Sequence, residues 1–328
     1  MKYLAVDVGG TSTRAAVVDD EGACVGYGTA GSGNPTSSGS VAAVSSILTA
    51  ARAAMEESGL AAVDLAAATV GIAGAGGATG PKLHAELVGG GMPGNLTLEP
   101  DLLAAFHSGS IAGDGYALVA GTGSAAVRVR GGRIEATCDG LGWLLGDGGS
   151  GFWIGHRAVL AASSALDGRA PSTALVGLVL ATLGIEETGT RDPSGRSSAL
   201  QHMVAPIYQL RPIELSRFAP LVFEAEANGD DVARQIADSA AAALAGTLAT
   251  VVVPDVRGPL VLSGSVLSKQ PSVARRILES ARIADHDPTV ITVTDGLAGA
   301  VVLALRRAGV TVDDGVFACI QASLAALR

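Results

Sequence analysis

The feature that most constrains the fold is a strand–turn–strand pattern that occurs twice. An apolar strand runs into a turn of glycine and threonine and a second apolar strand follows, first over residues 3–18 and again over residues 116–130. Segments with helical or strand-like periodicity alternate after each copy. Internal duplication of this kind predicts an α/β protein of two domains, each a mixed sheet flanked by helices, with a ligand cleft between them.

Domain boundaries follow from the position of the second copy. Residues 1–114 are expected to form the first domain and residues 115–328 the second, with a last helix over 313–327 as a candidate to pack back on the first domain. The chain has 328 residues, of which 48% are hydrophobic and 16% charged. That composition predicts two sizeable apolar cores and little disorder.

Charge and cysteine content argue against several classes of function. The net charge is −9 and Lys and Arg do not cluster, so neither nucleic acid nor a membrane surface is an expected partner. The chain lacks an apolar stretch near the roughly 20 residues that cross a bilayer. Three distant cysteines, Cys24, Cys138 and Cys319, predict neither a disulfide framework nor a metal cluster. We expect a cytoplasmic protein whose oligomeric state is open, a homodimer included.

The first glycine turn is suited to binding phosphate. Gly9, Gly10, Thr11 and Thr13 offer backbone N–H groups and hydroxyls to phosphate oxygens. Asp7, at the end of the preceding strand, could hold a nucleotide-bound Mg²⁺ through water. For a single hairpin, a plain glycine turn beside a solvated aspartate is the alternative interpretation.

The second turn, at Gly121, Thr122 and Gly123, favours the phosphate interpretation. Two such turns at equivalent places of duplicated domains can hold one triphosphate from both sides. The chain has neither a Gly-x-x-x-x-Gly-Lys-Ser/Thr loop nor a dinucleotide-binding fingerprint, which argues against P-loop enzymes and Rossmann dehydrogenases. The two hairpins therefore predict a site for the phosphate tail of ATP.

Five segments carry a resemblance to a known family: residues 7–11, 100–101, 121–124, 142–155 and 262–266, of which 142–155 is the most specific. Over nearly its whole length the chain resembles the N-acetylglucosamine kinase family, in the superfamily of sugar kinases, actin and heat-shock chaperones. The resemblance implies two actin-like (ribonuclease H-like) domains. It also implies transfer of a phosphoryl group from ATP, with Mg²⁺, to the 6-hydroxyl of an amino sugar such as N-acetylglucosamine.

The resemblance also implies roles for single residues. Asp101 matches the catalytic base, since a carboxylate near an alcohol can orient it and accept its proton; a helix N-cap is the alternative. Asn34 and Asp147 match sugar-binding positions, although Asn34 also suits a turn. The other matches are Ser124, Gly140, Leu141 and Gly142 for the sugar, and Thr11, Thr122, Ala219, Gly264, Ser265 and Lys269 for the nucleotide. Three aromatic residues, Trp143, Phe152 and Trp153, are expected in the pocket wall or the core.

Two departures from the family pattern leave the sugar open. Ala125 stands where animal members have a sugar-contacting Asn, and Gly148 replaces an acidic residue. Glucosamine, N-acetylmuramic acid and a neutral hexose are therefore alternative substrates. A different class is the activator ATPase of 2-hydroxyacyl-CoA dehydratases and benzoyl-CoA reductases, whose iron–sulfur cluster requires closely placed cysteines, whereas Cys138 has none nearby in sequence. A sugar sensor without catalysis would not need a base beside a phosphate site.

Overall fold

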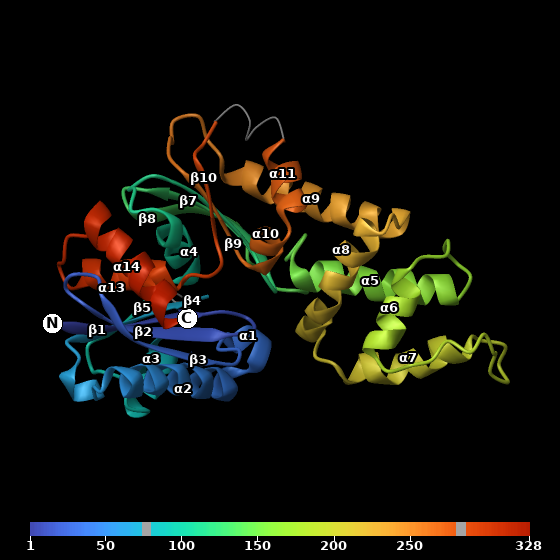
Figure 1. Ribbon diagram of the computed structural model, residues 1–328, viewed down its shortest axis with the longest axis horizontal. Coiled ribbons are helices and arrows are strands. Elements are labelled where there is room, and N and C mark those ends of the chain that lie inside the picture. Colours follow the sequence, from blue (N-terminus) through green and yellow to red (C-terminus); the bar gives the residue numbers. More distant parts are fainter. Residues whose placement is uncertain (74–79, 280–286) are drawn as a thin grey trace.

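The computed structural model describes residues 1–73, 80–279 and 287–328, and among them the strands form two five-stranded sheets (Figure 1). The strands of the first sheet are β1 (Lys2–Val8), β2 (Thr13–Asp19), β3 (Cys24–Ala30), β4 (Ala67–Ile72) and β5 (Leu96–Pro100). Those of the second are β6 (Gly115–Ala120), β7 (Ser124–Arg130), β8 (Arg133–Asp139), β9 (Leu260–Ser263) and β10 (Val290–Val293). Their orders are β3-β2-β1-β4-β5 and β10-β9-β6-β7-β8.

Both sheets have the same topology. Three strands, β1–β3 or β6–β8, form an antiparallel meander. Two more strands extend each meander in parallel, β4 and β5 from β1, and β9 and β10 from β6. The mixed sheets and the duplication predicted from the glycine hairpins are thereby confirmed. It follows that β5 in the first sheet corresponds to β10 in the second.

Helices cover both faces of the first sheet (Figure 1). On one face lie α2 (Ser40–Ser58) and α3 (Gly80–Gly89), with the short helices α1 (Pro35–Ser38) and η1 (Ala62–Asp64) beside them. The buried side of α2 repeats at helical spacing, through Ile47, Ala51 and Met55, and packs on Leu4 and other side chains of β1. Gly59, with a φ of 70°, ends α2 in the left-handed conformation that glycine accepts readily.

The end of the chain covers the other face of that sheet. α13 (Leu297–Arg307) contacts β1 and β4, and α14 (Asp314–Leu327) contacts β3. The backbone N–H of Cys24 donates to the hydroxyl of Ser323 on α14 at 3.0 Å. Figure 1 shows both helices, in red, against the blue strands. The domain boundary between residues 114 and 115 stays a prediction. The structure shows in addition that α13 and α14 pack on the first sheet.

One helix crossing positions the start of α4 (Asp101–Gly109). A Cβ on Gly299 of α13 would lie 1.7 Å from the carbonyl oxygen of Ala104, so only glycine permits this approach. The hydroxyl of Ser108 donates to that carbonyl at 3.1 Å and accepts from the N–H of Gly299 at 2.8 Å. Because α4 also contacts β4 and β6, its first residue, Asp101, is fixed relative to both sheets.

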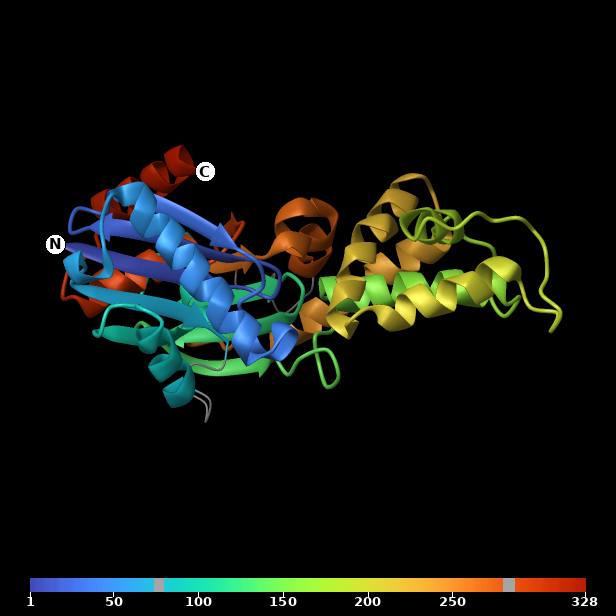
Figure 2. The same ribbon diagram turned by 90° about the horizontal axis from the view of Figure 1, so that it is seen from below.

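A helical region follows the second meander and extends to the right in Figure 2. It contains α5 (Gly151–Leu166), α6 (Leu175–Thr182), α7 (Ser198–Gln209), η2 (Pro212–Phe218), α8 (Ala219–Ala227) and α9 (Asp231–Val251), and α10 (Ser265–Lys269) and α11 (Pro271–Leu278) follow β9. α7 forms although Pro206, which has no N–H to donate, lies inside it. The 3₁₀ turn η2 leads directly into α8. Within the described ranges, we find no helix with the length and apolar character needed to span a membrane.

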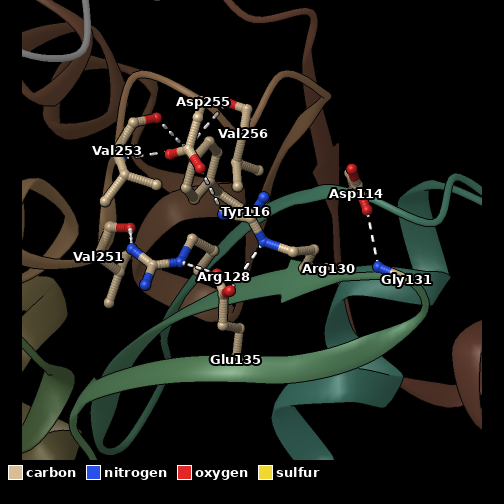
Figure 3. Close-up of polar contacts among 10 residues, drawn as sticks. All are labelled: Asp114, Tyr116, Arg128, Arg130, Gly131, Glu135, Val251, Val253, Asp255 and Val256. Atoms are coloured by element: carbon tan, nitrogen blue, oxygen red, sulfur yellow. Dashed lines mark hydrogen bonds and ion pairs between the residues drawn. The ribbon is translucent and has the colours of Figure 1, made fainter.

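A polar network holds the second sheet to the end of α9 (Figure 3). The Tyr116 hydroxyl lies 3.0 Å and 3.1 Å from the carbonyl oxygens of Val253 and Val256, and it accepts from the N–H of Val253 at 3.2 Å. Arg128 donates to the carbonyl oxygen of Val251, the last residue of α9, at 2.7 Å. The sheet thus satisfies a carbonyl at the end of α9 and two carbonyls of the segment that follows the helix.

Candidate active site

The two glycine turns face each other between the sheets. A Cβ on Gly10 of the first turn would lie 3.4 Å from the Cβ of Thr122 in the second. A cavity of about 350 Å³ lies along this contact. Most of the predicted site residues line it: Asp7, Gly9, Gly10, Thr11, Asn34, Asp101, Gly121, Thr122, Gly123, Ser124, Gly140, Leu141, Gly142, Asp147, Gly264 and Ser265. The structure therefore brings the predicted phosphate and sugar residues into one cleft.

A second cavity, of about 520 Å³, is lined by the same two turns. It shares Gly10, Thr11, Gly121, Thr122 and Ser265 with the first cavity and adds Ala219 and Lys269, so the predicted nucleoside residues meet here. Pro220 and Phe223 give it apolar surface, while Arg211 and Arg217 give it positive charge. This mixture suits a purine ring and its phosphates.

Thr13 is the exception among the predicted nucleotide residues, and its prediction is wrong. Its side chain is fully buried and its hydroxyl donates to the carbonyl oxygen of Gly31 at 2.9 Å. Because successive side chains of β2 point to opposite faces, Thr13 faces the core while the next residue, Arg14, faces the cleft. The hydroxyl of Thr13 holds the loop after β3 and does not reach the phosphate site.

Asp7 lies at the bottom of the cleft, near the end of β1. Its Oδ2 accepts from the backbone N–H of Gly296, just before α13, at 3.0 Å. Burial raises the pKa of Asp7 to about 7, and the neighbouring carboxylate of Asp295 acts in the same direction, while Arg14 opposes them. A divalent cation would compensate this disfavoured negative charge, so Asp7 could hold Mg²⁺.

Magnesium would need further ligands besides Asp7. Among residues 1–73, 80–279 and 287–328, the structure contains no group of three or more His, Cys, Asp or Glu side chains that could hold a metal. Mg²⁺ commonly retains several waters and takes oxygens from substrate phosphates, with one or two protein carboxylates. A single buried carboxylate beside a phosphate cradle fits that coordination.

Asp101 is the first residue of α4 and lines the same cavity. Its Oδ1 accepts from the N–H of Leu102 at 2.9 Å, and Pro100 occupies the N-cap position. The alternative interpretation of Asp101 as the N-cap is therefore wrong: Asp101 is the first helical residue, and its side chain accepts from a helix N–H while it lines the cleft. Burial raises its pKa to about 6, against the hydrogen bond from Leu102. A carboxylate with this pKa is ionised at neutral pH and can still take up a proton.

Asp147 reaches the cleft from the loop after β8. Its Oδ1 accepts from the backbone N–H of Ser124 at 2.9 Å, and the Ser124 hydroxyl donates to the carbonyl of Gly148 at 3.0 Å. Burial raises the pKa of Asp147, with a smaller contribution from Asp139. One carboxylate oxygen is thus used to fix the side chain, and Asp147 lines the same cavity as Asn34 and Gly140.

The three aromatic residues near this loop have different environments. Trp143 lines the cavity and packs edge-on against Phe152, with ring centroids 6.0 Å apart. Phe152 is buried, and Trp153 lies under the guanidinium of Arg157. Of the three, Trp143 is therefore the residue that can contact a ligand in the cleft.

Two charged residues of the cleft were missed by the sequence analysis. Arg14 and Asp295 both line the cavity, and Arg14 Nε lies 3.5 Å from Asp295 Oδ2. Arg328 also pairs with Asp295, at 2.8 Å. A signal existed for Asp295, because it follows β10 and precedes a helix, as Asp101 follows β5. For Arg14 the signal was its position in a strand: successive side chains point to opposite faces, so Arg14 points away from the face that Thr13 occupies.

Comparison with known proteins identifies the family. The sequence profile of the BadF/BadG/BcrA/BcrD ATPase family matches residues 4–304. The glucosamine kinase GspK of Vibrio cholerae is 28% identical over 240 residues, which cover 73% of this chain and 76% of GspK.

Solved structures show the same fold. A proposed N-acetylglucosamine kinase from Chromobacterium violaceum superimposes with a TM-score of 0.71 at 24% identity, over 92% of this chain and 98% of that one. Another, from Porphyromonas gingivalis, gives 0.69 at 22% identity, over 93% and 99%. These similarities confirm the predicted actin-like fold of two α/β domains. With a profile that matches nearly its whole length, the chain belongs to the BadF/BadG/BcrA/BcrD ATPase family.

Proposed function

We propose that the protein is an ATP-dependent kinase that phosphorylates the 6-hydroxyl of an amino sugar. The first candidate for this sugar is N-acetylglucosamine. The observation that carries the proposal is the position of Asp101, at the cleft wall next to two facing phosphate-binding turns. Its raised pKa suits a group that accepts a proton from an alcohol. The similarity to GspK, a glucosamine kinase, supports an amino sugar as the acceptor.

In the proposed reaction the nucleoside occupies the larger cavity and the triphosphate lies along the turns at Gly10 and Thr122, which line both cavities. The 6-oxygen of the sugar attacks the γ-phosphorus, the bond from that phosphorus to the bridging oxygen of ADP breaks, and Asp101 accepts the hydroxyl proton. Bound Mg²⁺, held near Asp7, would neutralise phosphate charge. Arg14 can stabilise the charge on the transferred group, because its guanidinium faces the same cleft.

Two features of the cleft bear on the identity of the sugar. Leu141 and Trp143 give the wall apolar surface, which an N-acetyl group could cover. Opposed to this, Asp7, Asp101, Asp147 and Asp295 give the same cavity several carboxylates, which would attract the ammonium group of free glucosamine. The second feature makes glucosamine the second candidate.

A coupled assay of ATP consumption tests the proposal. The protein is given N-acetylglucosamine, glucosamine, N-acetylmuramic acid or glucose, with a control that lacks sugar, and ³¹P NMR locates the new phosphate ester. We expect ADP to form only with an amino sugar and the ester to lie on carbon 6. An equal rate of ADP formation without sugar would refute the kinase and favour an activator-type ATPase.

A further inference from the structure

The carboxylate of Asp139 lies at the centre of the loop that forms one wall of the cleft. Asp139 is the last residue of β8. Its Oδ1 accepts from the backbone N–H groups of Asp147, at 2.9 Å, and Leu141, at 3.4 Å, and its Oδ2 accepts from that of Gly148 at 3.3 Å. A Cβ on Gly146 would lie 2.0 Å from Oδ1, so the chain closes tightly around this carboxylate.

The backbone at Asp139 is held in an unfavourable conformation. Asp139 has a φ of 65°, in the left-handed region, and so has Asp147, with a φ of 61°. Residues other than glycine persist there when the surrounding contacts hold them. For Asp139 those contacts include its own carboxylate, which turns back onto the loop. For Asp147 they include the hydrogen bond that Asp139 accepts from its N–H.

The same loop presents the proposed sugar-binding groups. Gly140 donates from its N–H to the carbonyl of Ser124 at 3.0 Å, and Ser124 donates from its N–H to Asp147 Oδ1. Asp139 therefore fixes the backbone of Asp147, while the backbone N–H of Ser124, on β7, fixes the side chain of Asp147. Asp139 itself is not among the residues that line the cavity, so its effect on a ligand passes through the loop.

We propose that Asp139 is a positioning residue: its carboxylate holds the loop over residues 140–148, and through it Asp147, in the geometry that binds the sugar. The sugar-binding half of this inference rests on the proposed function, whereas the loop-holding half does not. A hydrogen bond to a charged acceptor is stronger than one between neutral groups, so three of them on one carboxylate can maintain a strained loop. The Coulombic contribution of Asp139 to the raised pKa of Asp147 agrees with this proximity.

The test uses Asp139→Asn, which tolerates the left-handed conformation and removes the charge and one acceptor oxygen. Asp139→Gly is the second variant, because glycine adopts a φ of 65° freely and any effect then comes from the lost carboxylate. The matched control is Asp114→Asn. Asp114 also accepts a backbone N–H, from Gly131 at 2.7 Å, but at the opposite end of β7 and β8 (Figure 3).

Hydrogen exchange on the full-length protein without ligands measures the loop directly. We expect the amides of Asp147 and Gly148 to exchange about tenfold faster or more in both Asp139 variants and unchanged in Asp114→Asn. Unaltered exchange in Asp139→Asn and Asp139→Gly would overturn the proposal, whatever reaction the protein performs. Thermal denaturation of the three variants identifies any that is merely unfolded.

Kinetics test the connection to the sugar. We expect the Asp139 variants to raise KM for the sugar about tenfold, to leave KM for ATP unchanged, and to add little when Asp147→Asn is already present. An equal effect in the Asp147→Asn background would refute action through Asp147. If the wild-type protein phosphorylates no sugar, the proposed function fails, and the exchange measurement still decides whether Asp139 holds the loop.

Discussion

Replacing Asp101 with Asn tests the assigned base, because the change should affect activity and stability in opposite directions. The pKa of Asp101 is raised from 3.8 to about 6 by burial, so the fold disfavours the ionised carboxylate that catalysis needs. Asn has the same shape and keeps an oxygen that can accept from Leu102. It cannot take up the proton of an alcohol at neutral pH.

The expected gain in stability follows from that pKa. At about 1.4 kcal/mol for each tenfold change in ionisation, holding the charge in the folded state costs up to about 3 kcal/mol. The side chain is half-buried and faces an open cleft, so water screens part of this free-energy cost. We therefore expect Asp101→Asn to raise the free energy of unfolding by about 1–2 kcal/mol at pH 8. The gain should be full above pH 6, decrease as pH falls through the pKa of the folded state, and vanish below about pH 4, where the carboxyl is protonated in both states.

Urea unfolding at pH 8 and pH 4 measures the stability, and the coupled assay measures turnover. We expect kcat of Asp101→Asn to fall by about 10²–10⁴, and kcat/KM of the wild type to fall about tenfold per pH unit below pH 6. Asp231→Asn is the matched control, since Asp231 is also the first residue of a helix, α9, but its side chain is 73% exposed. Turnover within tenfold of wild type would refute the base, and lower stability at pH 8 would refute the reasoning from burial.

Three further changes test other parts of the structure. Asn34→Ala should raise KM for the sugar about tenfold and leave KM for ATP unchanged, and an unaltered sugar KM would contradict its role. Gly299→Ala should destabilise by about 2 kcal/mol or more in urea, because its Cβ would meet the carbonyl of Ala104, whereas Gly246→Ala, in open space on α9, should not. Tyr116→Phe should lower the free energy of unfolding by about 1–3 kcal/mol with unchanged kinetics, since it removes a buried hydroxyl far from the cleft, and equal stability would count against the network.

The fold could be predicted where local patterns determine it. The glycine hairpins gave both meanders, and helical spacing through Ile47 and Met55 gave α2, because each pattern is complete within one element. The sequence analysis did not predict α7: Pro206 opposes a helix locally, while buried Leu200 and Met203 secure it by packing with residues distant in sequence. Tertiary contacts of this kind have no local signal.

The cleft shows the same division between local and distant information. An acid near the end of an apolar strand, as Asp7, or directly after one, as Asp101, is visible in the sequence, and both line the cavity. Thr13 was assigned from its hydroxyl alone, although strand alternation places it opposite Arg14 and thus in the core. The role of Asp139 depends on a loop that brings the backbone N–H of Asp147, eight positions later, back to the Asp139 carboxylate. Sequence spacing alone does not predict that contact.

Duplication gives a further argument about the acidic residues of the cleft. Because β5 and β10 occupy equivalent places in their sheets, Asp101 at the start of α4 and Asp295 shortly before α13 are counterparts from the two halves. The two have diverged in their surroundings: Asp295 is paired with Arg14 and Arg328, whereas the hydrogen bond described for Asp101 comes from the backbone of Leu102. Because two guanidinium groups engage its carboxylate oxygens, Asp295 is suited to hold Arg14 in the cleft, which leaves Asp101 as the proposed base.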